Sequence, residues 1–184
     1  MSELKSFAIS FLIDVRTSPY SKWVPQFNQG IIENWLQHEG IRYVYMGDYI
    51  GGRPQNDMCY DEEGYFDYHK MAEEPLFKTG LHRLINANSK HCKVAIMCSE
   101  SDPSECHRSK LIGRELYFAH HISVNHIVAI NKTISQEEIM TMLTKGAWEP
   151  GGNLFGECIP PYFKSRKSYK TVTATSADAF NPYD

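Results

Sequence analysis

The chain has 184 residues, of which 42% are hydrophobic and 22% charged, a composition typical of a globular protein with a single core. Its net charge of −3 argues against a globally basic nucleic-acid binder, although it leaves room for a local basic cleft. Five cysteines without regular spacing favour reduced thiols over a disulfide framework. The sequence shows no signal peptide and no membrane-length apolar run, so we expect a cytoplasmic protein with no membrane partner.

The first half of the chain alternates short apolar runs with helical patterns. A nearly continuous apolar run over residues 6–16 predicts a buried strand. Residues 29–40 carry apolar side chains at helical spacing and end on a glycine, and residues 41–47 are β-branched and aromatic. Strand, helix and strand in this order are typical of a βαβ unit. We therefore expect an α/β fold in three layers, with a mostly parallel central sheet and helices on both faces.

The same alternation continues to about residue 142. Gly51 and Gly52 open an acidic and aromatic segment, residues 52–74, whose lack of periodicity predicts a long surface loop. Ser135 with Glu138 three residues later fits the capping box of a helix. The other expected elements are a helix over 75–88, a strand over 92–98, a helix from 102 to about 120, a strand over 123–130 and a helix from 135 to 142.

Two regions follow from this pattern, a single α/β domain over residues 1–160 and a tail over residues 161–184. The segment KSRKSYK, residues 164–170, is basic, and the residues after it are small and polar. This composition predicts an extended or disordered tail. Its basic segment fits either a contact to phosphate or a solvated stretch that happens to be basic.

The segment MCSESDPSECHRSK, residues 97–110, has the features of a helix start. Asp102 is a good N-cap, Pro103 suits the first helical position, and Glu105 stands where it would close a capping box. A helix N-terminus beside the carboxyl end of a parallel strand attracts anions, and ligands of open α/β sheets bind at that edge.

Charged and thiol side chains follow two strands that we expect to be parallel neighbours. Asp14 and Arg16 end the first strand, Cys98 and Glu100 end the later one, and Arg108 lies in the first turns of the next helix. These residues should converge at one edge of the sheet, where two arginines indicate an anion-binding site. The alternative is an internal network of ion pairs between the carboxylates and the arginines.

The cysteines raise the question of thiol or metal chemistry. Cys98 and Cys106 are candidate catalytic residues, since a helix N-terminus lowers the pKa of a thiol, although a small buried residue is the default role. Arg108 does not stand at the spacing of a phosphatase loop. Cys98, Cys106 and His107 lack CxxC or HxxxH spacing, so we expect no metal and no other cofactor.

Several segments occur in the order found in a known family. They are LIDVRTSPYSKWVPQFN, GIRYVYMGDYIGGRP and VAIMCSESDPSECHRSKLIGREL, with VNHIV closing the series. With these motifs the chain resembles the domain-of-unknown-function family 488 over about residues 6–130. The resemblance implies a small α/β domain with no established activity. Its recurrent polar positions correspond here to Asp14, Arg16, Pro19, Ser21, Phe27, Asn28, Gly51, Gly52, Cys98, Glu100, Cys106, His107 and Arg108. Of these we expect Asp14, Arg16, Ser21, Asn28 and Arg108 to bind the substrate or anion.

Three functions remain open from the sequence. The first is an enzyme of hydrolase type for an anionic substrate such as a nucleotide or nucleic acid, with Arg16 and Arg108 as the anion clamp and Glu100 or His107 as the proton-transfer group. The second is a non-catalytic module for nucleic acid or nucleotides. The third is a structural or interaction domain. The stacking surfaces of the second function would be Tyr20, Trp23 and Phe27. The sequence leaves the oligomeric state open.

Overall fold

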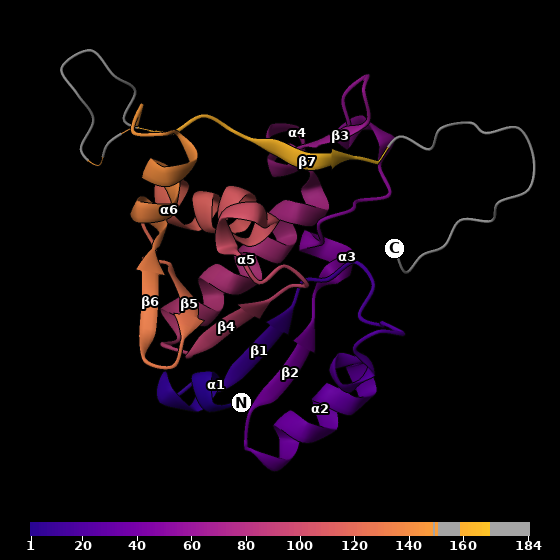
Figure 1. Cartoon of the computed structure of the whole chain (residues 1–184), viewed down its shortest axis with the longest axis vertical. Helices are drawn as coiled ribbons and strands as arrows, with labels where there is room; N and C mark the ends of the chain where they lie inside the picture. Colours follow the sequence, from indigo (N-terminus) through magenta and orange to yellow (C-terminus); the bar gives the residue numbers. More distant parts are fainter. Residues whose placement is uncertain (149, 151–158, 170–184) are drawn as a thin grey trace, which may run out of the picture.

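A computed structural model describes residues 1–148, 150 and 159–169 of the chain (Figure 1). At its centre lies a three-stranded sheet in the order β2-β1-β4, with both neighbours parallel to β1. The strands are β1 (Phe11–Asp14), β2 (Arg42–Tyr45) and β4 (Val94–Met97). The expected mixed α/β fold with a parallel sheet is confirmed. The first strand is shorter than its apolar run of residues 6–16, and helix α1 (Ser2–Ser6) precedes it.

Helices cover both faces of this sheet. Since side chains alternate along a strand, Leu12 and Ile13 point to opposite faces. Leu12 packs with the buried Ile32 and Leu36 of α2 (Gln29–His38). Ile13 packs on the other side with Leu81 of α5 (Pro75–Ser89). The larger core therefore lies between the sheet and α5, and α2 closes the opposite face (Figure 1).

The segment after the loop that follows β4 winds as a succession of short helical elements. They are η3 (Pro103–Glu105), η4 (Arg108–Gly113) and η5 (Glu115–Ala119), and the last two have π-helical hydrogen bonding. Asp102 caps η3 as expected, because its Oδ1 accepts a hydrogen bond from Ser104 N at 2.8 Å. Glu105 forms an ion pair with Arg166 at 3.1 Å.

The segment predicted as a long surface loop contains regular structure. After α3 (Gly47–Ile50) come η2 (Asp57–Cys59), β3 (Tyr65–Asp67) and α4 (Tyr68–Glu73). Its buried side chains hold it on the large core, and these are Cys59, Phe66, Tyr68, Met71 and Ala72. The aromatic residues of this segment show no regular spacing in the sequence because each one packs a separate short element onto the core.

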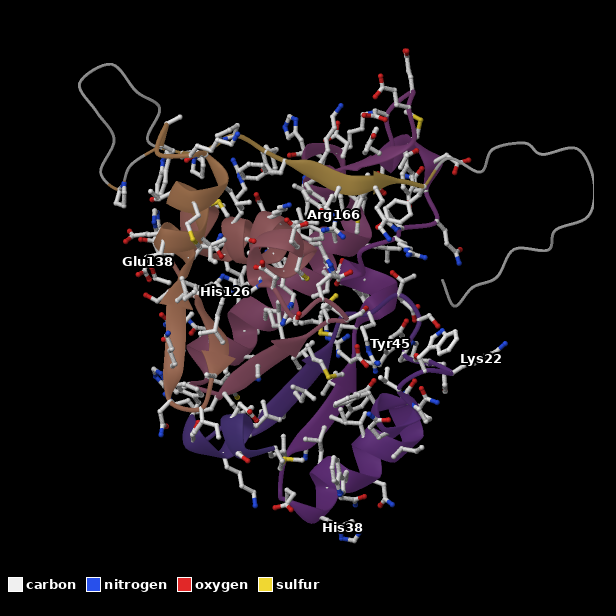
Figure 2. All side chains as sticks on the ribbon, in the orientation of Figure 1. Lys22, His38, Tyr45, His126, Glu138 and Arg166 are labelled. Carbon is white, nitrogen blue, oxygen red and sulfur yellow. The ribbon has the colours of Figure 1, made fainter. Side chains whose placement is uncertain are left out.

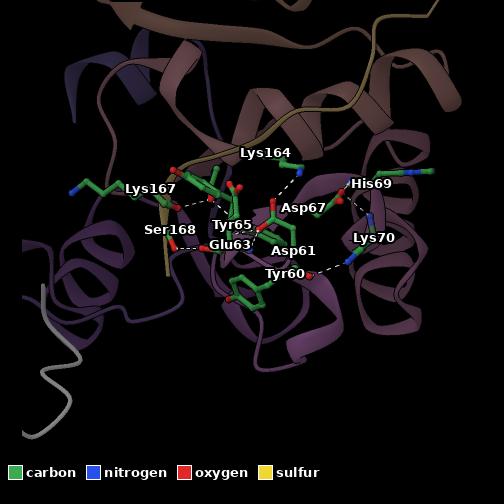
Figure 3. Close-up of polar contacts among 12 residues, drawn as sticks. Tyr60, Asp61, Glu63, Tyr65, Asp67, His69, Lys70, Lys164, Lys167 and Ser168 are labelled. Atoms are coloured by element: carbon green, nitrogen blue, oxygen red, sulfur yellow. Dashed lines mark hydrogen bonds and ion pairs between the residues drawn. The ribbon is translucent and has the colours of Figure 1, made fainter. Parts of the chain in front are cut away.

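Part of the predicted tail is a strand of this body. Strand β7 (Lys164–Ser168) pairs antiparallel with β3, with Asp67 opposite Lys164 (Figure 3). Lys164 Nζ contacts Asp61 Oδ2 at 2.7 Å, and Ser165 Oγ accepts a hydrogen bond from Phe66 N at 2.9 Å. Residues about a hundred positions earlier in the sequence thus hold this strand in place. It is extended, as predicted for the tail, but it is packed against the rest of the protein. Residues 170–184 lie outside the described part of the chain.

The last predicted strand belongs to a hairpin rather than to the central sheet. Strands β5 (Asn125–Ala129) and β6 (Lys132–Ser135) pair antiparallel across a turn in which Asn131 has a φ of 55°. The capping box predicted at Ser135 is present at the start of α6 (Gln136–Leu143). Among the described residues, no helix combines the length and apolar character needed to span a bilayer.

Candidate functional site

Asp14 and Arg16 form a buried ion pair at the carboxyl end of β1. Asp14 is 0% exposed and Arg16 is 8% exposed. Arg16 Nε donates to Asp14 Oδ1 at 2.9 Å, and the Tyr43 hydroxyl donates to Asp14 Oδ2 at 2.7 Å. Arg16 Nη2 also donates to the Phe27 carbonyl at 2.9 Å. The pair therefore connects β1 to β2 and to the loop that follows β1. This is the internal ion-pair network that the sequence allowed as the alternative to an anion-binding site.

Ser21 and Asn28 shape the loop between β1 and α2. Asn28 Oδ1 accepts a hydrogen bond from Ser21 N at 2.6 Å, and Ser21 Oγ accepts one from Trp23 N at 3.2 Å. Figure 2 shows Lys22 of this loop on the same side of the molecule as Tyr45, whose hydroxyl donates to Thr17 O at 3.0 Å. These bonds give Ser21 and Asn28 a structural part in the loop.

Four side chains meet at the carboxyl end of β4, and we call them the thiol cluster: Cys98, Glu100, Cys106 and His107. The Cys98 thiol donates to Glu100 Oε2 at 2.9 Å, and Cys106 Sγ lies 3.7 Å from the same oxygen. His107 Nδ1 lies 3.7 Å from Cys98 Sγ and 3.8 Å from Cys106 Sγ. Cys106 and His107 are buried, Cys98 is half-buried and Glu100 is exposed, so the cluster extends from solvent into the core.

Arg108 supplies positive charge beside the thiol cluster. Its Nε donates to Cys106 Sγ at 3.2 Å, its backbone N donates to the same sulfur at 3.4 Å, and its Nη2 donates to the Glu100 carbonyl. Unlike Arg16, Arg108 is only partly buried. It is therefore the better placed of the two predicted arginines to contact a ligand.

The two thiols differ in acidity because they act on each other. A hydrogen bond from Cys106 holds the pKa of Cys98 below its ordinary value, in spite of burial. The neighbouring Cys98 and burial raise the pKa of Cys106 to about 12. The Arg108 donors would favour a thiolate at Cys106, but the pair resists a second negative charge once Cys98 has lost its proton.

Glu100 is ionised more readily than an ordinary glutamate. Although the residue as a whole is exposed, the partial burial of its carboxyl group would by itself raise the pKa, but hydrogen bonds from Cys98 and from its own backbone N–H, together with the charge of His107, bring the pKa below its usual value. A carboxylate at the mouth of the thiol cluster is available to accept a proton or to bind a cation.

Gly52 fixes the position of the His107 ring. A Cβ at residue 52 would lie 2.9 Å from His107 Nδ1, which is closer than real Cβ contacts, so the loop can approach the imidazole only with glycine there. On its far side, His107 Nε2 is buried with no hydrogen-bond partner among the described residues. The same loop is held to the end of β1, since Arg53 N donates to Thr17 Oγ1 at 3.0 Å.

Cys98, Cys106 and His107 form a group that could hold a metal ion. Their two sulfurs and one ring nitrogen all lie within 4.8 Å of one another. The spacing of these residues in the sequence gives no such signal, because one thiol comes from the end of β4 and the other two groups come from the start of the next helical segment. The sequence grouped the four cluster residues as catalytic candidates, but it missed Tyr43 as a partner of Asp14.

The comparison with known families matches residues 1–114 to a family described as a domain of unknown function, DUF488. This match covers more than half of the 184 residues. The chain belongs to the DUF488 family. The DUF488 match includes the thiol cluster and ends within the helical segment that follows it. Neither a curated protein nor a solved structure matches the chain.

Proposed function

We propose that this DUF488 protein is an enzyme of hydrolase type for an anionic substrate, with the thiol cluster as its reaction centre. The observation that carries the proposal is an exposed carboxylate, Glu100, in hydrogen-bond contact with one thiol and 3.7 Å from a second, at the carboxyl end of a parallel strand. Ligands of open α/β sheets bind at this edge.

Glu100 and Arg108 take distinct roles in this proposal. The Glu100 carboxylate, with its lowered pKa, is ionised at neutral pH and takes a proton from the attacking water. A guanidinium has five N–H donors, and the side-chain hydrogen bonds of Arg108 to other described residues use its Nε and one donor of Nη2. The remaining donors are available to a phosphate or carboxylate of the substrate. Arg16, which the sequence placed in the same clamp, is already engaged by Asp14 and Phe27.

The test is a substrate panel of nucleoside mono-, di- and triphosphates and nitrophenyl phosphate mono- and diesters. We expect turnover by the native protein and a fall in kcat of about 100-fold or more in Glu100→Gln, as for other proton-transfer groups, with substrate binding retained. Glu105→Gln is the matched control, since Glu105 pairs with Arg166 and should leave kcat within about twofold. Native-like kcat in Glu100→Gln would refute the assignment.

A second candidate, binding of single-stranded nucleic acid without turnover, is favoured by an aromatic surface beside the site. Trp23 is 85% exposed, and Tyr20 and Phe27 of the same loop are also exposed. A hollow of about 340 Å³ is lined by Gln26 of the same loop and by residues of α2 that include Ile31 and Trp35. Bases stack on such rings with little sequence preference. Quenching of tryptophan fluorescence by an oligonucleotide, lost in Trp23→Ala, would support this function.

A further inference from the structure

We infer that Cys98, Cys106 and His107 bind one divalent cation of the zinc type, with Glu100 at or beside the fourth coordination position. The inference deepens the proposed function, on which it rests for its catalytic meaning, because the ion would supply the electrophile that activates water there. Metal binding itself can be measured without a substrate. The two claims can therefore fail separately.

The distances in the thiol cluster are those of a tetrahedral ligand set. Zn–S bonds of about 2.3 Å and Zn–N bonds of about 2.0–2.1 Å, meeting at tetrahedral angles, place sulfur and nitrogen about 3.6 Å apart. His107 Nδ1 lies 3.7 Å from one sulfur and 3.8 Å from the other. An ion could enter between these three atoms with shifts of a few tenths of an ångström.

The charges of the thiol cluster also favour a cation. Binding a metal releases the proton of each thiol, which places two thiolates next to the Glu100 carboxylate. Arg108 contacts one of these sulfurs and the Glu100 carbonyl, so it offsets only part of that charge. A divalent ion at the centre of the group would compensate the remainder.

The ligand types indicate which ion fits. Two sulfurs and one imidazole nitrogen make a soft donor set, which suits zinc and disfavours magnesium or calcium, whose preferred ligands are oxygens. Cobalt(II) is a spectroscopic substitute that accepts the same tetrahedral geometry. We therefore expect selectivity for zinc and cobalt over magnesium.

Glu100 decides whether the coordination is closed or open. Its Oε2 lies 3.7 Å from Cys106 Sγ, which suits a tetrahedral edge, but only 2.9 Å from Cys98 Sγ, which is too short for one. The exposed Glu100 side chain must therefore move outward, either to ligate from farther away or to leave the position to water. Three protein ligands and one exchangeable position are characteristic of catalytic zinc, not of structural zinc.

The three ligands are held by regular structure on both sides. Cys98 follows β4 directly, and Cys106 and His107 lie between η3 and η4. Gly52 packs against the His107 ring and limits its rotation. Such support preorganises the ligands before the ion arrives, which reduces the cost of binding.

The experiment measures metal content and affinity in the full chain, purified without a histidine tag. We expect about one zinc per chain by elemental analysis, in line with a single three-ligand site. Added cobalt(II) should give the sulfur-to-cobalt charge-transfer absorption of a thiolate-ligated ion, and excess magnesium should not displace it.

Variants locate the ion. Cys98→Ser, Cys106→Ser and His107→Gln should each weaken zinc binding by at least about 100-fold, more than the loss of an outer-shell partner. Cys92→Ser is the matched control, because Cys92 is a half-buried thiol near the other end of β4 and should bind as the native chain does. Glu100→Gln should retain the metal.

Two results would overturn the inference. One is a native chain that takes up less than about a tenth of an equivalent of zinc and shows no cobalt–sulfur absorption, since a site of this ligand set binds tightly. The other is an equal loss of zinc in Cys92→Ser, which would place the ion elsewhere. Stoichiometric metal without turnover would reject the proposed function alone, whereas turnover by a native chain that takes up no zinc would reject the metal site alone.

Discussion

Arg16 and Arg108 stand at the same edge of the sheet with different surroundings. Arg16 is 8% exposed and shares its donors between Asp14 and Phe27, while Arg108 is only half-buried beside the thiol cluster. Their positions at the edge could be predicted, because Arg16 follows β1 closely and Arg108 lies at the start of the helical segment that follows β4. The ion pair of Arg16 with Asp14 was one of the two alternatives that the sequence allowed. The further contacts could not be predicted, since they involve a carbonyl eleven residues away and the Tyr43 hydroxyl on another strand.

At the residue scale, Asp14→Ala tests the structural role of the ion pair. The substitution leaves the Arg16 guanidinium buried without its carboxylate, so we expect a loss of about 3–5 kcal/mol in the free energy of unfolding. Denaturant unfolding measures this loss. Glu73→Ala, which removes the exposed pair with Lys78, should cost less than about 1 kcal/mol. Equal effects of the two substitutions would contradict the buried-pair account.

Two glycines give a second test at this scale. In Gly52→Ala the new Cβ would meet His107 Nδ1 at 2.9 Å, so the ring must shift and zinc affinity should fall by about 10-fold or more, as for other changes that reorient a ligand. In Gly30→Ala the new Cβ would have no atom within 4 Å, and alanine in α2 should stabilise the fold by up to about 1 kcal/mol. Unchanged zinc affinity in Gly52→Ala would mean that the loop does not position the ring.

At the scale of elements, local patterns predicted α2, α5 and the capping box of α6, because spacing and capping residues lie within a few positions of one another. Strands β3 and β7 were not predicted. Their pairing joins Asp67 to Lys164, and neither segment carries an alternating apolar pattern that a sequence window could detect. The thiol cluster was predictable only in part. Its members are close in sequence, so their grouping could be predicted, but the loop after β4 and η3 determine the distances between them.

The β5–β6 hairpin and α6 are joined to η4 through His126, labelled in Figure 2. His126 Nε2 donates to Gln136 Oε1 at 2.8 Å, and Gln136 Nε2 donates to Ser109 O at 3.0 Å. Burial lowers the pKa of His126 below its ordinary value of 6.5. The imidazole is therefore neutral in the folded protein at pH values where it is already protonated in the unfolded chain.

This difference predicts a pH dependence of stability. The folded chain binds fewer protons at His126 than the unfolded chain does. The stabilisation that the neutral His126 gives to the fold is therefore fully present above pH 6.5 and is lost as the pH falls toward the lowered pKa. We expect the native chain to lose its stability advantage over His126→Gln between pH 8 and pH 5, measured by thermal unfolding. A difference between the two proteins that does not change with pH would contradict this assignment.

At the scale of the whole molecule, the parallel sheet explains why the site lies where it does. All three strands point the same way, so the loops after β1 and β4 meet at one edge. The loop of residues 51–53 joins them there through the hydrogen bond from Arg53 N to Thr17 Oγ1. The sequence predicted this edge because fold class and strand direction follow from the βαβ pattern. It could not predict a metal-ligand geometry, which requires the distances between side chains on separate elements.

The most direct test of the zinc site is diffraction from zinc-soaked crystals at the zinc absorption edge. Zinc in the thiol cluster should give one anomalous peak per chain, about 2.3 Å from Cys98 Sγ and Cys106 Sγ and about 2.0–2.1 Å from His107 Nδ1. A thiol cluster without such a peak, in crystals whose protein has taken up zinc at another place, would contradict the zinc site.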